Sequence, residues 1–97
     1  MERYFEWDSK KAESNFQKHG LRFEEAALVF DDQFAVSEPD RIENGEQRWR
    51  TIGMIDGCWL LVVVAHTVRF EERGIEVIRV ISARRAGRKE RRLYEHG

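Results

Sequence analysis

The feature that most constrains the fold is a run of apolar and β-branched residues from Trp59 to Val68. A nearly continuous run of this kind is typical of a strand that is covered on both faces of a sheet. Its most apolar part, Cys58 to Ala65, is far shorter than the roughly 20 residues that cross a bilayer. We therefore predict a buried central strand here and no membrane span.

Two further strands are predicted beside this run. Asp56-Gly57 is a two-residue hairpin signal, and the segment before it, Gln47–Ile55, alternates in polarity. After the run, Phe70–Gly74 is predicted to be a second turn and Ile75–Ser82 the next strand. Consecutive strands joined by short turns pair antiparallel, so this region predicts a meander.

The strand signals are weaker elsewhere. Phe34–Ser37 is predicted to be a short strand that Pro39 ends, and Asp40–Gly45 is predicted to be a polar loop. Tyr4–Trp7 is either a short strand or an extended arm.

Helices are predicted on both sides of the meander. Asp8 is placed to cap a helix over Ser9–His19, and Gly20 suits the left-handed conformation that ends one. A second helix is expected over Leu21–Phe30, packed with the first as a hairpin across the sheet. A basic helix is expected over Arg84–Glu95. The predicted fold class is α+β, with two N-terminal helices, an antiparallel meander of about four strands and a C-terminal helix.

Length and composition predict one small domain over residues 1–97. The chain is 41% hydrophobic and 36% charged, which is enough apolar content for a core, although a small one. Cys58 cannot form an internal disulfide and is expected in the core. Met1–Trp7 has no apolar run typical of a signal peptide, so a cytoplasmic location is expected.

The charges are distributed unevenly. Residues 1–46 carry twelve acidic and six basic side chains, whereas residues 47–97 carry six acidic and eleven basic ones. A basic half of this kind predicts contact with a polyanion. The net charge of −1 argues against strong non-specific DNA binding.

Three arginines lie within the predicted strands. Arg79 shares a strand face with apolar neighbours, so it should either be paired in a salt bridge or lie in a cleft as an active-site cation. Arg48 and Arg50 share one strand face and either converge with Arg79 on an anion or keep a sheet edge soluble. The basic C-terminal segment, including Arg84 and Arg88, is either a solvated helix face or a phosphate-binding surface.

The histidines offer weaker candidates for acid–base chemistry. His66, near the end of the central strand, is either a half-buried packing residue or a general acid or base. His19 either stabilises the end of its helix or takes part in a site. Their spacing does not match a metal site, and the sequence has no dinucleotide or nucleotide fingerprint, so neither a metal nor a cofactor is predicted.

Several segments together resemble the BrnT family of ribonuclease toxins. The Lys18-His19-Gly20 block and the Ile81-Ser82-Ala83-Arg84 block are specific in combination, and the similarity covers nearly the whole chain. The turn at Val68–Gly74 looks longer than is usual in the family. The other matching segments are Phe5–Asp8, Asn15, Phe23–Ala26, Val29–Asp32, Arg48 with Ile52-Gly53, Leu61–Val64, Arg79-Val80 and Glu90–Arg92 with Tyr94-Glu95.

The resemblance implies a RelE-like fold, RNA cleavage without a metal that halts translation, and a cognate antitoxin, BrnA-like and DNA-binding. A homodimer or a heterotetramer with the antitoxin is expected. With this in view, Arg79 and Arg48 are candidate phosphate clamps. His66, Lys18 and His19 are candidates for acid or base. The alternative is a non-catalytic module that represses transcription together with the antitoxin. Substrate binding is expected from Arg84, Arg50 and Arg88.

Overall fold

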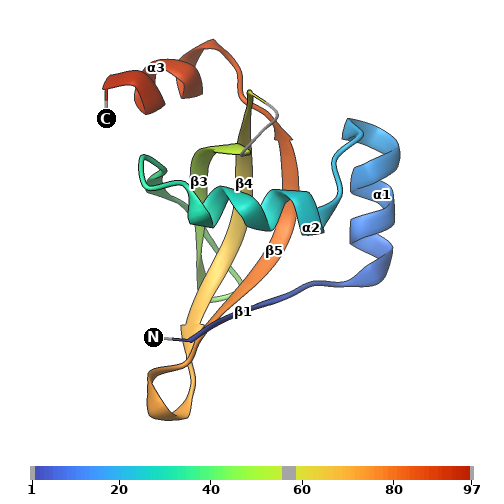
Figure 1. Cartoon of the computed structure of the whole chain (residues 1–97). Helices are drawn as coiled ribbons and strands as arrows, with labels where there is room; N and C mark the ends of the chain where they lie inside the picture. The colour runs from blue at the N-terminus through green and yellow to red at the C-terminus, as the bar shows by residue number, and fades with distance from the viewer. Residues whose placement is uncertain (1, 56–58, 97) are drawn as a thin grey trace.

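A computed structural model describes residues 2–55 and 59–96, and these form a sheet flanked by helices (Figure 1). The predicted hairpin turn at Asp56-Gly57 and the predicted core position of Cys58 lie outside the described residues. The elements are β1 (Arg3–Glu6), α1 (Ser9–His19), α2 (Phe23–Ala26), η1 (Ala27–Asp31), β2 (Val36–Glu43), β3 (Glu46–Ile55), β4 (Leu60–Phe70), η2 (Glu72–Gly74), β5 (Glu76–Arg85) and α3 (Arg88–His96).

The sheet has five strands in the order β1-β5-β4-β3-β2. Strands β2 to β5 form the predicted antiparallel meander, with β4 at its centre. The prediction of a purely antiparallel sheet is wrong, because β1 pairs parallel with β5. The α1–η1 segment and the meander separate these two strands in sequence, and a connection of that length is what a parallel pair needs.

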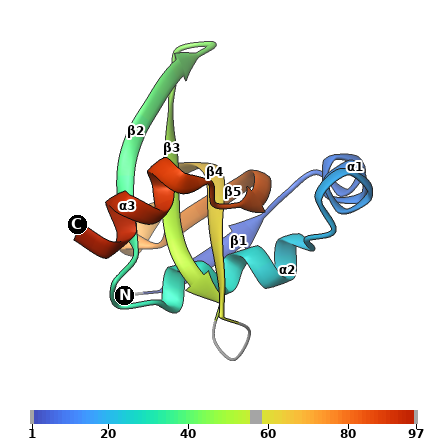
Figure 2. The same ribbon diagram turned by 90° about the horizontal axis from the view of Figure 1, so that it is seen from above.

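The two faces of the sheet carry different helices, which lie on opposite sides of it in Figure 2. We call the side covered by α2 and η1 the α2 face, and the opposite side the α3 face. Phe23 and Val29 pack against Val62 and Val64 in the core of the α2 face. The smaller core of the α3 face consists of Ile52, Leu61 and Val63, with Met54, Ala86 and Tyr94 packed against it.

Strand β2 is longer than predicted. The segment read as a loop over Asp40–Gly45 is mostly strand, and Asn44 and Gly45 turn it into β3 with φ angles of 53° and 76°. Two consecutive positive φ angles are typical of a type I′ hairpin turn, for which Asn-Gly is the preferred pair. Pro39 does not end the strand, because β2 is an edge strand whose register shifts between Pro39 and Ile42.

The second predicted helix is α-helical only over Phe23–Ala26 and continues as a 3₁₀ helix. The chain comes very close to β3 here, since a Cβ at Gly53 would lie 2.7 Å from Val29 Cγ1. Asp32 then accepts a hydrogen bond from the backbone of Met54 at 2.7 Å. These contacts explain why the segment is held tightly against the sheet.

The C-terminal helix begins at Arg88, four positions later than predicted, because β5 extends to Arg85. One residue beyond the strand, the Ala86 N–H donates to the Leu61 carbonyl at 2.9 Å, so the chain remains hydrogen-bonded to β4 after β5 ends. Arg84 is therefore a strand residue.

Asn15 joins α1 to the part of β5 that β1 does not reach. Its amide oxygen accepts from the Ala83 N–H at 3.0 Å, and its amide nitrogen donates to the Ala83 carbonyl at 2.9 Å and the Leu21 carbonyl at 3.1 Å. The side chain thus substitutes for a neighbouring strand. This explains why the buried residue of the short helix α1 is an asparagine.

We expect Asn15→Ala to lower the free energy of unfolding by about 2–4 kcal/mol, since it leaves buried backbone groups of Ala83 unpaired. Ser14→Ala, an exposed neighbour on α1, is the matched control and should change stability by less than about 0.5 kcal/mol. Urea unfolding followed by circular dichroism measures both. Equal midpoints for wild type and Asn15→Ala would contradict this role.

Candidate functional site

Arginines from three strands line one depression on the α3 face. It encloses about 250 Å³, with Arg41 from β2, Arg48 and Arg50 from β3, and Arg84 from β5. We call it the arginine pocket. A concave site lined by several guanidinium groups is suited to binding an anion. Its remaining lining residues are Asp40, Val63, Ala65, Ile81 and Ser82.

Strand alternation explains how β3 contributes two arginines. Arg48 and Arg50 lie on one strand face, as predicted, and it is the face of Ile52, whereas Thr51 between them lies on the α2 face. Arg48 pairs with Glu43 at 2.8 Å, and Arg50 pairs with Glu38 directly across the β2–β3 ladder. These carboxylates hold both guanidinium groups in place.

Both guanidinium groups keep unused donors. The Nε atoms of Arg48 and Arg50 are buried and have no hydrogen-bond partner within the part of the chain that the structure describes. A buried unpaired donor costs about 1–3 kcal/mol, more for a charged group. Neighbouring orphan donors in one cationic pocket therefore favour a site that is completed by a bound anion.

Arg84 connects the pocket to α3. Its guanidinium donates to both oxygens of Glu90 at 3.1 and 3.4 Å, and the Gly87 N–H donates to the same carboxylate at 2.6 Å. The Arg84 hydrogen bond and that of Gly87 lower the pKa of Glu90. The first turn of α3 is thereby fixed to one wall of the pocket.

Arg79 lies on the α3 face but does not line the pocket. It donates to Glu46 at 2.5 Å, with both side chains about two-fifths exposed. The predicted alternative of a salt bridge is thus realised, and the partner, Glu46, is a strand residue. Arg48 and Arg79 share a face, and each of them is also paired with a carboxylate.

His66 lies on the opposite face from the pocket. It is 3% exposed, its Nε2 lies 2.7 Å from Thr51 Oγ1, and its ring meets Phe30 edge-on at 4.9 Å. Burial lowers the pKa of His66 to about 4, against a smaller raising effect of the Thr67 carbonyl. The geometry is that of a neutral packing residue.

Lys18 and His19 lie at the end of α1, whose N-cap at Asp8 and left-handed Gly20 are as predicted. Both line a second depression of about 330 Å³. Arg88, the first residue of α3, is exposed. The predicted candidates therefore fall into separate places, and of these the arginine pocket gathers Arg48, Arg50 and Arg84.

Asp40, Arg41 and Ser82 are pocket residues that were not among the predicted candidates. Asp40 and Arg41 lay in the segment read as a loop. Asn44-Gly45 was the available signal, since it indicates a hairpin that would have placed both on a strand opposite β3. Within residues 2–55 and 59–96, no helix is long and apolar enough to cross a membrane.

Comparison with known proteins finds one protein family whose model matches this chain. The family model described as "Ribonuclease toxin, BrnT, of type II toxin-antitoxin system" matches residues 7–90. A search of curated proteins gave no match. The matched segment includes every residue of the arginine pocket and ends at Glu90, which anchors α3 to Arg84.

The buried state of His66 predicts a pH dependence of stability. The folded-state pKa of about 4 is below the ordinary value of 6.5, so the unfolded chain takes up a proton first as the pH falls. The contribution of neutral His66 to the free energy of unfolding is complete at pH values above its ordinary pKa. It decreases by roughly 1.4 kcal/mol per pH unit as the pH falls from the ordinary pKa to the folded-state pKa. Urea unfolding should therefore show wild type about 2 kcal/mol less stable at pH 5 than at pH 7.5.

In His66→Gln this dependence should largely disappear over the same interval, whereas His19→Gln, at the end of α1, should retain it. Parallel stability curves for wild type and His66→Gln would show that His66 is not the group responsible.

Proposed function

This chain belongs to the BrnT family of ribonuclease toxins of type II toxin–antitoxin systems, and from this premise we propose that its arginine pocket is where it cleaves RNA. The observation that supports this assignment is the convergence of Arg48, Arg50 and Arg84 from two strands on one 250 Å³ depression. Guanidinium groups bind phosphate oxygens through paired N–H donors.

The ion pairs of these arginines are compatible with phosphate binding. A guanidinium has five N–H donors, and a carboxylate engages one or two of them. Glu43, Glu38 and Glu90 thus orient the three groups and leave donors for the substrate. Donors held in place before the reaction stabilise the charge that develops on the phosphorane, which is the main role of a cation here.

We propose that the nucleophile is the substrate's own 2′-hydroxyl. Its proton is transferred to the Asp40 carboxylate, the bond from O2′ to phosphorus forms, and the bond to O5′ breaks, giving a 2′,3′-cyclic phosphate. The departing O5′ takes a proton from a water molecule at the Ser82 hydroxyl, and the resulting hydroxide is neutralised by the proton that Asp40 then releases, which regenerates the Asp40 carboxylate. Among the described residues that line the pocket, Asp40 is the one with a carboxylate.

Cleavage without a metal is part of this proposal. The pocket contributes four guanidinium groups and a single carboxylate, a donor set that suits an anion and disfavours a divalent cation. The arginines supply the positive charge that a metal supplies in other nucleases.

Two other predicted residues are proposed to have supporting roles. Arg79, on the same face as the pocket, and Arg88, at the start of α3, would bind the RNA backbone outside the pocket. His66 takes no part in this mechanism, because it is buried on the α2 face.

The biological consequence proposed is inhibition of translation, relieved by a cognate antitoxin. The family implies such a partner. A BrnA-like, DNA-binding antitoxin, and assembly as a homodimer or a heterotetramer with it, remain predictions. In the alternative of a non-catalytic co-repressor, purified protein would leave RNA intact.

Arg50→Ala should lower the rate of RNA cleavage by about 10²–10³-fold, since it removes one charge-stabilising group from the pocket. Purified protein is incubated with RNA in excess EDTA, and the products are resolved by electrophoresis. Arg73→Ala is the matched control, because Arg73 is exposed in η2, at the opposite end of the sheet from α3 (Figure 1). If folded Arg50→Ala cleaves at the wild-type rate, the pocket is not the active site.

Asp40→Asn should lower kcat by roughly 10²–10⁴-fold with little change in KM, because the amide keeps the shape and loses the proton acceptor. Asp31→Asn, an exposed carboxylate at the end of η1, serves as control. A kcat in folded Asp40→Asn that stays within a few-fold of wild type would remove Asp40 from the mechanism.

A further inference from the structure

A lysine-lined depression beside α1 meets the arginine pocket at β5. Its lining includes Ile81 and Ser82, which also line the arginine pocket. The two hollows are therefore adjacent across a single stretch of strand. We call the second one the lysine groove; its other lining residues are Lys10, Lys11, Ser14, Asn15, Lys18 and His19.

A β-bulge creates this junction. Ala65 pairs with Ser82 and His66 with Val80, so Ile81 is an extra residue with no partner on β4. A bulge bends its strand and redirects side chains. β1 pairs with β5 only as far as Arg79, so the edge at Ile81 faces α1 and not another strand. Consequently Ile81 and Ser82 are reached from both hollows.

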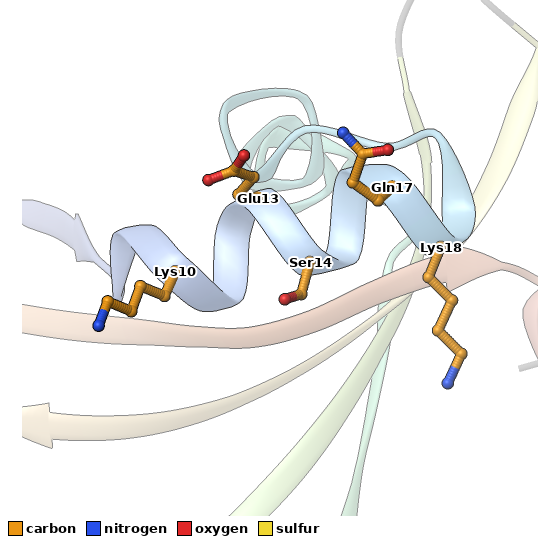
Figure 3. A pocket seen from close by; sticks show the side chains of 5 residues that line it. All are labelled: Lys10, Glu13, Ser14, Gln17 and Lys18. Atoms are coloured by element: carbon orange, nitrogen blue, oxygen red, sulfur yellow. The ribbon is translucent and has the colours of Figure 1, made fainter.

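The lysines of the groove are free to bind a ligand. Among the described residues Lys10, Lys11 and Lys18 form no ion pair, in contrast to the pocket arginines Arg48 and Arg84. Figure 3 shows a neighbouring depression on α1, in which Lys10, Ser14 and Lys18 extend from one side of the helix and Glu13 and Gln17 from the other. Glu13 is not among the residues that line the lysine groove.

We infer that the lysine groove binds the phosphates of single-stranded RNA that flank the cleaved bond, so that the strand crosses β5 at Ile81-Ser82 on leaving the arginine pocket. This inference rests on the proposed function, since it assumes RNA in the pocket. Unpaired lysine ammonium groups along a groove bind a phosphate backbone without regard to sequence. A single strand fits, because in-line attack by the 2′-hydroxyl requires a backbone geometry that a regular A-form duplex does not provide.

The inference predicts that the substrate is a chain of several nucleotides. A dinucleotide can occupy the arginine pocket alone, whereas a longer strand gains the lysine contacts as well. The lysines should therefore affect affinity for long RNA and have no effect on the turnover of a dinucleotide.

The test compares Lys11→Gln/Lys18→Gln with the charge-matched control Arg73→Gln/Lys89→Gln. Binding of a fluorescein-labelled twelve-nucleotide RNA with 2′-O-methyl groups, which cannot be cleaved, is measured by anisotropy over a range of salt concentrations. Cleavage of a dinucleotide is measured in parallel. The lysine double variant should bind the RNA at least about tenfold more weakly than wild type. The slope of the logarithm of its binding constant against the logarithm of the salt concentration should be smaller in magnitude by about 1.4, whereas the control variant should match wild type.

If both double variants bind the twelve-nucleotide RNA as wild type does, while Arg50→Ala still lowers the rate of cleavage as predicted, the lysine groove is refuted and the proposed function stands. If wild type neither binds the RNA nor cleaves it, the proposed function fails, and the inference fails with it. If the lysine variant keeps its affinity for RNA but no longer binds its antitoxin, the groove is a protein-binding surface and the inference is overturned.

Discussion

Burial of β4 on both faces is the constraint on which the rest of the structure depends. Leu61, Val62, Val63 and Val64 are each at most 3% exposed, and each such side chain stabilises the fold by roughly 1.5–3 kcal/mol. The strand can be covered only if both sides of the sheet carry other elements. The α2–η1 segment covers one side and α3 covers part of the other, which leaves the remainder of the α3 face open for a site.

That open part of the α3 face carries charge instead of apolar cover. Arg48, Arg50, Arg79 and Arg84 project from neighbouring strands, and isolated cations so close together would repel one another. Each is matched with a glutamate, and the glutamates come from β2, the start of β3, and α3. The pairs are partly exposed, so solvent screening limits what they contribute to stability. Their main effect is to orient the guanidinium groups around the pocket.

The α3 helix has a structural role next to this pocket. Glu90 holds it to Arg84, and the Tyr94 hydroxyl donates to Asp32 at 2.7 Å. Burial together with the Asp32 carboxylate raises the pKa of Tyr94 to about 12. Asp32 also accepts from the Met54 backbone, so one carboxylate connects η1, β3 and α3. Burial alone would raise the pKa of Asp32, but its hydrogen bonds from Met54, Tyr94 and Phe34 outweigh that effect and lower it.

Local patterns in the sequence determined the central strand, the alternation that places Arg48 and Arg50 on one face, and the caps of α1. Each depends on residues a few positions apart, where strand and helix periodicity act directly. The resemblance carried by Lys18–Gly20 and Ile81–Arg84 was sufficient for the family. The parallel pairing of β1, the bridge from Asn15 to Ala83 and the meeting of Arg84 with Arg50 were decided only by the tertiary structure. These contacts join segments far apart in the chain, and their energies depend on a geometry that exists only once the sheet has formed.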